Sequence, residues 1–136
     1  ALLASGAAPS ALATMCPGIF DVPGHGPVAL TNAGANTPGS DVGILDLLPG
    51  GKVVAHMNAR TYFADSCMEG IYSNARYSAM ELLGKKLTFT TEIQDAGCGC
   101  NAAFYLVSMR QNPQISTCND YYCDANKVCG VSCTEV

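Results

Sequence analysis

Hydrophobic and polar residues alternate along residues 86–93 of the chain. The odd positions are mostly apolar and the even positions are charged or hydroxylated: Leu87, Phe89, Thr91 and Ile93 against Lys86, Thr88, Thr90 and Glu92. Because successive side chains of a β-strand point to opposite faces, each of these two sets would lie on one face. The pattern predicts a strand with one buried face and one face in water.

A second strand is predicted at residues 102–109, which are apolar at almost every position. Such a run is typical of a strand that is covered on both faces and lies inside a sandwich. The connector, residues 94–101, contains aspartate, asparagine and two glycines, which favour turns and positive φ angles. Together the three segments predict a β-hairpin.

Shorter elements are predicted upstream of this hairpin. Residues 14–50 contain five prolines, which exclude long regular elements because proline fixes φ and lacks an amide hydrogen. Within this region, residues 28–31 and 42–48 are either short strands or apolar plugs bound in loops. Alternation over residues 52–59 predicts another strand, which residues 61–63 would extend.

The remaining segments are predicted to be short or irregular. Residues 76–83 contain enough helix-forming side chains for a helix of about two turns, which Gly84 would stop. After Met109, the Asn112-Pro113 pair breaks the strand. The polar residues 117–124 are predicted to form a loop held by cysteines.

Composition narrows the class of protein. A length of 136 residues allows one domain, and 49% hydrophobic against 13% charged residues is sufficient for a core. A net charge of −4 without a basic patch argues against nucleic acid as a partner. No apolar run reaches the roughly 20 residues of a transmembrane segment.

The cysteines offer two interpretations, a metal site or a set of disulfides. There are eight: Cys16, Cys67, Cys98, Cys100, Cys118, Cys123, Cys129 and Cys133. Zinc sites use paired C-x₂-C units, which are missing here, and His25 and His56 have no acidic neighbour at a useful spacing. We therefore expect no metal, and disulfides formed in an extracytoplasmic, oxidising compartment. The spacing leaves their pairing open.

The segment GKKLTFTTEIQDAGCGCNAAFYLVSM (residues 84–109) resembles the inner-sheet hairpin of family 7 glycoside hydrolases, the cellobiohydrolases and endoglucanases. YSAMELLG, YCDANKV and CTEV resemble further elements of that family, so the resemblance covers residues 75–136. It implies an all-β fold, part of a concanavalin-like β-sandwich (jelly roll) with long disulfide-braced loops. Residues 14–136 would form an incomplete domain of this kind, with a loop rather than a helix at residues 76–83.

The resemblance also implies a chemistry. Retaining glycosidases use a nucleophile and an acid/base, two carboxyl groups about 5–5.5 Å apart. Glu135 matches the family's nucleophile, and a helper aspartate and the acid/base glutamate would be the second and fifth residues after it, beyond Val136. Asn101 and Tyr105 match positions that face the glucan cleft. The alternative for Tyr105 is a core aromatic with its hydroxyl paired.

For the cysteines, the resemblance implies that Cys123 and Cys129 bond with partners near Cys133, and that Cys98 pairs with a cysteine far downstream. Cys100 stands where the family has an apolar residue, which would place an extra bridge or a free thiol beside the cleft. The chain has no tryptophan, the residue on which cellulose sites stack sugars, and its six tyrosines are the available substitutes.

Three functions remain open from the sequence. The first is a retaining β-1,4-glucan (cellulose-type) hydrolase that needs no cofactor. The second is a non-catalytic subunit of a larger assembly, with protein subunits as partners, and the third is a carbohydrate-binding module. Residues 1–13 are small and apolar and end in an A-x-A pattern, so they are either a targeting remnant or an arm docked on a partner.

Overall fold

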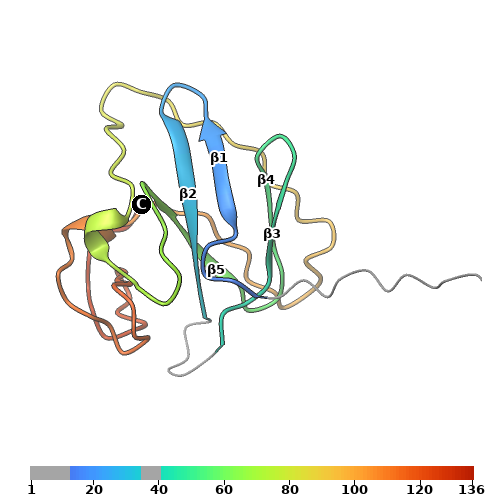
Figure 1. Ribbon diagram of the computed structural model, residues 1–136. Helices are drawn as coiled ribbons and strands as arrows, with labels where there is room; N and C mark the ends of the chain where they lie inside the picture. The colour runs from blue at the N-terminus through green and yellow to red at the C-terminus, as the bar shows by residue number, and fades with distance from the viewer. Residues whose placement is uncertain (1–12, 35–40) are drawn as a thin grey trace, which may run out of the picture.

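The computed structural model describes residues 13–34 and 41–136, which form short β-strands joined by long loops (Figure 1). The strands are β1 (Gly18–Val22), β2 (Gly26–Ala33), β3 (Leu45–Leu48), β4 (Lys52–Ala55) and β5 (Arg60–Ala64), and two single 3-10 turns are η1 (Asn74–Arg76) and η2 (Met109–Gln111). The described residues contain no α-helix. The all-β prediction is confirmed. The predicted arm at residues 1–13 lies almost entirely outside the described residues.

The strands make two antiparallel sheets. One sheet has the order β1-β2-β5, and the other is the β3-β4 hairpin. Residues 28–31 lie within β2, and β3 forms the second half of the predicted segment 42–48, so both segments contribute strands. The prediction that residues 61–63 extend the strand of residues 52–59 is wrong. They belong to β5, because the chain turns after β4 and pairs with β2 instead.

Both faces of the three-stranded sheet are buried at β2 and β5, whereas the edge strand β1 is partly exposed. Leu30 pairs with Phe63 and Ala29 pairs with Ala64, so the side chains of each pair lie on the same face of the sheet. Leu30 on one face and Ala64 on the other have no exposed surface. The sheet is therefore the middle layer of the molecule, with a cover on each side.

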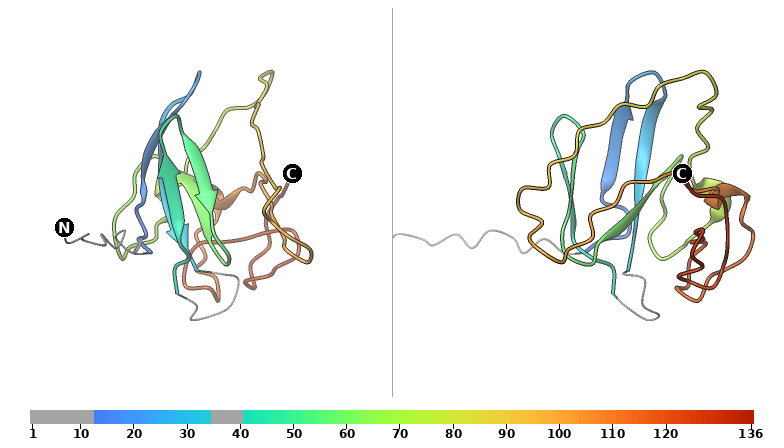
Figure 2. Two further views of the ribbon diagram at one scale, coloured as in Figure 1. Left: turned by 90° about the vertical axis from the view of Figure 1, so that its right-hand side faces the viewer. Right: turned by 180° about the vertical axis from the view of Figure 1, so that it is seen from behind.

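The first cover consists of the β3-β4 hairpin and the segment 84–104, which crosses the molecule behind the sheet in Figure 1 and in front of it in the right-hand view of Figure 2. A row of phenylalanine rings joins the two layers. Phe63 of β5 lies 5.4 Å from Phe20 and 5.9 Å from Phe104, and Phe104 lies 4.5 Å from Phe89, measured between ring centroids. Offset and edge-on contacts of this kind are the favourable geometry for aromatic pairs.

The second cover consists of irregular chain that packs against the opposite face of the sheet. Ala29, Ala33, Tyr62 and Ala64 of the sheet contact buried side chains of this loop layer: Tyr77, Met109, Tyr122, Cys123, Cys129 and Val131. The loop after Met109 is irregular, as predicted, and the lower left of Figure 1 shows it folded back beside β5. Four of the chain's eight cysteines lie in the loop after Met109.

The predicted hairpin between residues 86–93 and 102–109 does not form. Residues 86–93 have no strand partner among the described residues, and the end of the second run pairs elsewhere: Leu106 and Val136 exchange two backbone hydrogen bonds of 2.9 Å each. Phe89 and Ile93 are 56% and 61% exposed. Alternation alone does not supply a partner strand, so the segment stays mostly exposed, and Phe89 contacts only the neighbouring layer through Phe104.

The short helix considered for residues 76–83 is also absent. η1 ends at Arg76, and Tyr77 forms an isolated antiparallel bridge with Ala64 before the chain continues as a loop. The loop implied by the family resemblance is thus the better description of this segment. The strand predicted to follow this loop, at residues 86–93, does not form.

Three disulfides brace the loops: Cys16–Cys67, Cys118–Cys129 and Cys123–Cys133. Each contributes about 2–4 kcal/mol by constraining the unfolded chain. The partner of Cys123 agrees with the family-based expectation, whereas Cys129 pairs upstream and not near Cys133. Cys98 and Cys100, also proposed for bridges, are exposed and form no disulfide within the described residues. The far-downstream partner that the resemblance implies for Cys98 stays a prediction.

A buried carboxylate connects the loop layer to the sheet. Asp120 is almost fully buried, and its Oδ2 lies 2.8 Å from the guanidinium of Arg60 and 2.7 Å from the hydroxyl of Tyr62, both on β5. Its Oδ1 accepts hydrogen bonds from the Ser116 hydroxyl and the Tyr122 amide at 2.8 and 2.9 Å. Burial, with the negative charge of Asp120, raises the pKa of Tyr62, so its hydroxyl stays protonated and donates.

Removing the charge of this carboxylate should destabilise the fold strongly. Asp120→Asn leaves the Arg60 cation buried without its counter-ion, and breaking a buried ion pair costs about 3–5 kcal/mol. Urea denaturation with the disulfides intact measures the loss. Glu92→Gln is the matched control, because Glu92 pairs with Lys52 at the surface, where ion pairs contribute about 0–1 kcal/mol. Equal losses in the two variants would contradict the role of Asp120.

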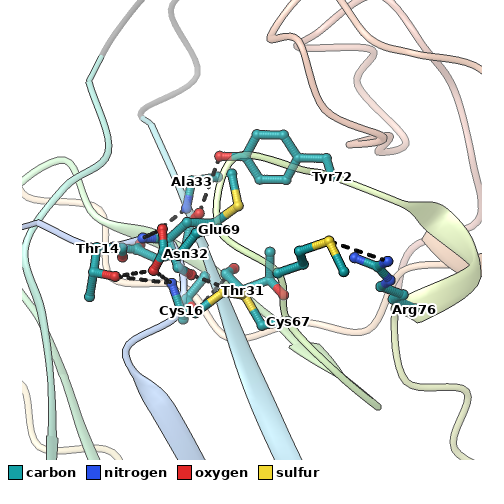
Figure 3. Close-up of a disulfide and its surroundings, with 12 residues drawn as sticks. Thr14, Cys16, Thr31, Asn32, Ala33, Cys67, Glu69, Tyr72 and Arg76 are labelled. Atoms are coloured by element: carbon teal, nitrogen blue, oxygen red, sulfur yellow. Dashed lines mark hydrogen bonds between the residues drawn. A yellow bond between two sulfur atoms is a disulfide. The ribbon is translucent and has the colours of Figure 1, made fainter.

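A second carboxylate holds the entry to β1 beside the Cys16–Cys67 bridge (Figure 3). Glu69 accepts hydrogen bonds from the Thr14 hydroxyl, from the Cys16 amide at 2.9 Å and from the Met15 amide at 3.3 Å. The Thr14 hydrogen bond, followed by the Cys16 amide, lowers the pKa of Glu69. Its ionised form therefore stabilises the folded chain.

The contribution of Glu69 should depend on pH. Because its folded-state pKa is depressed, the stabilisation is complete above the ordinary pKa of 4.5 and disappears as the pH falls through the depressed value. The difference in unfolding free energy between the wild type and Glu69→Gln should be largest near neutral pH and should close on acidification. Denaturation series at several pH values measure it. Glu81→Gln, at an exposed carboxylate, is the control and should show no such trend.

Candidate functional site

A cavity of about 400 Å³ separates the segment 101–105 from the disulfide-braced loop. Its lining residues are Asn101, Ala102, Ala103, Phe104, Tyr105, Tyr122, Asp124, Asn126, Val128 and Glu135. The three residues selected from the sequence, Asn101, Tyr105 and Glu135, all lie on this list. The fold thus brings together a carboxylate and two polar side chains that are about 30 positions apart in the chain.

Glu135 reaches the cavity because of the pairing at the end of the described chain. Glu135 forms an antiparallel bridge with Val107, and the hydrogen bonds of Leu106 with Val136 flank this bridge. Alternation then turns the Glu135 side chain inward, whereas the preceding Thr134 is exposed. The carboxylate is fixed further by the Ala125 amide, which donates a 2.9 Å hydrogen bond to Glu135 Oε2.

Tyr105 begins a chain of hydrogen bonds into the protein. Its hydroxyl lies 2.7 Å from the hydroxyl of Tyr122, which donates to Asp124 Oδ2 at 2.7 Å. Since Tyr122 gives its single hydroxyl proton to Asp124, Tyr105 is the donor in the first bond. Tyr105 thus has a paired hydroxyl, packs against the core and lines the cavity.

Burial raises the pKa of Tyr122, and the hydrogen bonds with Tyr105 and Asp124 raise it further, so this tyrosine stays neutral. Asp124 is 3% exposed, and both of its oxygens accept hydrogen bonds, one from Tyr122 and one from the Val128 amide at 3.0 Å. A carboxylate with its acceptors occupied in this way acts as an anchor. It orients Tyr122, and through Tyr122 it orients Tyr105.

Tyr122 and Asp124 were not selected as site residues from the sequence, although the Tyr-Cys-Asp element was noted. A usable signal was present. Tyr122 and Asp124 stand two positions apart, and side chains at this spacing share a side in extended chain. This spacing was the available signal that the two polar groups act together.

A larger and more open hollow of about 630 Å³ lies at the far side of the sheet, between β1 and the β3-β4 turn. It is lined mainly by apolar and glycine residues, and Asp21 is its one carboxylate. None of the residues selected from the sequence lies there. The smaller cavity is the better candidate site because it combines a half-buried carboxylate with ordered hydroxyl groups.

The described ranges 13–34 and 41–136 hold no group of three or more histidine, cysteine or acidic side chains placed to bind a metal. His25 lies in the β1-β2 turn, as expected for a loop residue. His56 has no acidic neighbour at a metal-ligand spacing in the sequence, but β3 places Asp46 Oδ2 2.8 Å from its Nε2 in space. Within the same ranges, no helix has the length and apolarity to cross a membrane.

A carboxylate held in a tyrosine-lined cavity by a disulfide-braced loop, on an all-β scaffold, is the kind of site expected in a glycoside hydrolase. The model of Glycosyl hydrolase family 7 matches residues 30–134, about three quarters of the chain, and the chain belongs to this family. The match begins well before residue 75, where the sequence resemblance was first evident, and ends one residue before Glu135. No solved structure matches the chain.

The Tyr122 hydroxyl should contribute more to the free energy of unfolding than the Tyr121 hydroxyl. Tyr122→Phe leaves the buried Asp124 Oδ2 without its donor, which costs about 1–3 kcal/mol. Tyr121→Phe is the matched control, because the Tyr121 hydroxyl makes no hydrogen bond in the described chain. Thermal and urea denaturation compare the two variants. If the Tyr122→Phe and Tyr121→Phe variants are equally stable, the hydrogen bonds from Tyr105 through Tyr122 to Asp124 do not stabilise the fold.

Proposed function

We propose that this protein is a β-1,4-glucan (cellulose-type) hydrolase that acts with retention and uses Glu135 as its nucleophile. The observation that carries the proposal is the position of Glu135 in one cavity with Asn101 and Tyr105. Family membership supports the class of reaction. The three disulfides support an extracytoplasmic location, where polysaccharide substrates are found.

The two oxygens of Glu135 have different tasks in this mechanism. Oε2 accepts the Ala125 amide hydrogen bond, which holds the carboxylate in place. Oε1 accepts no hydrogen bond within the described chain, so it is available to attack the anomeric carbon. The attack forms a glycosyl ester and expels the leaving oxygen, and water later cleaves the ester.

Protonation of the leaving oxygen needs a second carboxyl group, and Asp124 does not fit this role. Both of its oxygens accept hydrogen bonds from the protein, and its side chain is buried. The family resemblance assigns the acid/base to the fifth residue after Glu135. Asp124 supports the reaction indirectly, by fixing the Tyr122 and Tyr105 hydroxyls beside the nucleophile.

Asn101 and Tyr105 are proposed to contact the sugar. The Asn101 amide is exposed at the cavity wall and offers both a donor and an acceptor to sugar hydroxyls. Tyr105 donates its own proton to Tyr122, so its oxygen faces the substrate as an acceptor. Its half-buried ring adds an apolar surface of the kind on which sugar rings pack.

The role of Glu135 can be tested with a substrate that needs no acid catalyst. A 2-deoxy-2-fluoro-cellobioside with a dinitrophenyl leaving group expels that group without protonation, and the fluorine slows hydrolysis of the glycosyl ester. Intact mass should rise by one fluorocellobiosyl group, and peptide mapping should place this group on Glu135. Glu135→Gln should abolish labelling, because an amide is a far weaker nucleophile than a carboxylate.

Glu92→Gln is the matched control for this experiment, since it removes an exposed carboxylate outside the cavity, and it should label like the wild type. Labelling of another residue would contradict the assignment of Glu135. Binding of cello-oligosaccharides without any covalent label would instead support the carbohydrate-binding module. If the protein neither binds cello-oligosaccharides nor becomes labelled, the non-catalytic subunit is supported.

A further inference from the structure

A short chain of hydrogen bonds leads from the wall of the candidate cavity into the protein. Tyr105 lines the cavity, and its hydroxyl lies 2.7 Å from that of Tyr122, which donates to Asp124 Oδ2 at 2.7 Å. Tyr122 and Asp124 are each 3% exposed, so water competes little for these bonds. The chain therefore has one end at a buried carboxylate and the other end at the cavity.

The carboxylate fixes the direction of every bond in this chain. A hydroxyl has one proton to donate, whereas a carboxylate can only accept. Tyr122 therefore gives its proton to Asp124, and Tyr105 gives its proton to Tyr122. The Tyr105 hydroxyl has no second hydrogen-bond partner within the described residues. Its oxygen can thus accept a hydrogen bond from a ligand, but it has no proton left to donate.

The charged groups at the cavity wall point to the same kind of ligand. Asp124 and Glu135 both line the cavity, and the lining residues that the structure describes include neither lysine nor arginine. An anionic ligand would face these two carboxylates without a counter-ion, and like charges placed together are costly. The cavity therefore suits a neutral ligand that is rich in hydroxyl donors.

We propose that Asp124 sets the hydrogen-bond polarity of the cavity and restricts the position beside Tyr105 to a free hydroxyl group of a neutral saccharide. Such a hydroxyl donates to the Tyr105 oxygen. A fluorine atom or a methyl ether at the same position has no proton to donate, and its lone pairs would face those of Tyr105. Asp124 acts through Tyr122 and Tyr105, so it is a positioning residue. This role rests on the proposed function in one respect, that a saccharide binds in the cavity, and it does not require hydrolysis.

The contacts of Asp124 offer a way to reverse the chain. The Val128 amide donates to Asp124 Oδ1 at 3.0 Å, whereas Oδ2 faces Tyr122. In Asp124→Asn the carbonyl oxygen takes the place of Oδ1, because the amide nitrogen cannot accept from Val128. The nitrogen then takes the place of Oδ2 and donates to Tyr122. Tyr122 turns its proton to Tyr105, and Tyr105 turns its proton towards the cavity.

The test compares methyl β-cellobioside with analogues in which one hydroxyl at a time is replaced by hydrogen or by fluorine. Calorimetry on Glu135→Gln, a variant that prevents hydrolysis, gives a Kd for each compound. At one sugar position, both replacements should weaken binding about tenfold, and the fluoro analogue should bind no better than the deoxy analogue. Adding Asp124→Asn should invert this order at that position, because fluorine accepts the proton that Tyr105 now offers. A loosened fold alone would weaken all the compounds together.

Further variants keep the test decisive if Asp124→Asn does not fold. Tyr122→Phe breaks the chain and frees the Tyr105 proton, so the fluoro analogue should again bind better than the deoxy analogue. Tyr105→Phe should remove the difference between the two analogues. Tyr121→Phe is the matched control and should keep the original order, because the Tyr121 hydroxyl makes no hydrogen bond in the described chain.

Three results would overturn the proposal: no binding of methyl β-cellobioside, no sugar position with the expected order, or an order that neither Asp124→Asn nor Tyr122→Phe changes. Covalent labelling of Glu135 in a protein that lacks such a position would leave the proposed hydrolase standing and remove the role of Asp124. The expected order in a protein that is never labelled would support the role of Asp124 and remove the hydrolysis.

Discussion

The buried ion pair between Asp120 and Arg60 is the constraint on which the rest of the structure depends. A charge taken out of water is costly unless a counter-ion and hydrogen-bond donors surround it, so the loop that carries Asp120 has a single acceptable position against β5. In that position the Arg60 guanidinium lies 4.6 Å from the centre of the Tyr122 ring, a favourable cation–π contact. Tyr122 then extends its hydroxyl to the cavity on the other side.

The Cys123–Cys133 bridge acts on the same loop in a different way. The ion pair sets where the loop lies relative to the sheet, whereas the bridge sets the shape of the loop itself, by joining residues ten positions apart. Tyr122 and Asp124 flank one end of this bridge, and Glu135 lies two residues beyond the other. The cavity is therefore built by local chain on a covalent ring, and it is attached to the sheet through Asp120.

Alternation located β4, and apolar runs marked the segments that form β2 and β3, although the sequence left them open between strands and loop-bound plugs. The all-β class and the choice of Asn101, Tyr105 and Glu135 came from the family resemblance. Local pattern failed where the outcome depends on distant chain. The alternation around Phe89 predicts a strand that does not form, because nothing in the alternation specifies a partner strand or a second layer over the apolar face. Asp120 was missed for a related reason: in a polar stretch, a buried aspartate and a solvated one have the same sequence signature, and only the approach of Arg60 distinguishes them.

The bridge between Val107 and Glu135 makes the candidate site intolerant of changes in chain length. Side chains alternate along extended chain, so gain or loss of one residue between Cys133 and Glu135 would rotate the carboxylate outward and present its neighbour to the cavity. The composition of this short tether is free to drift over evolutionary time, whereas its length is not. Natural insertions and deletions should accordingly accumulate in the surrounding loops and spare this interval.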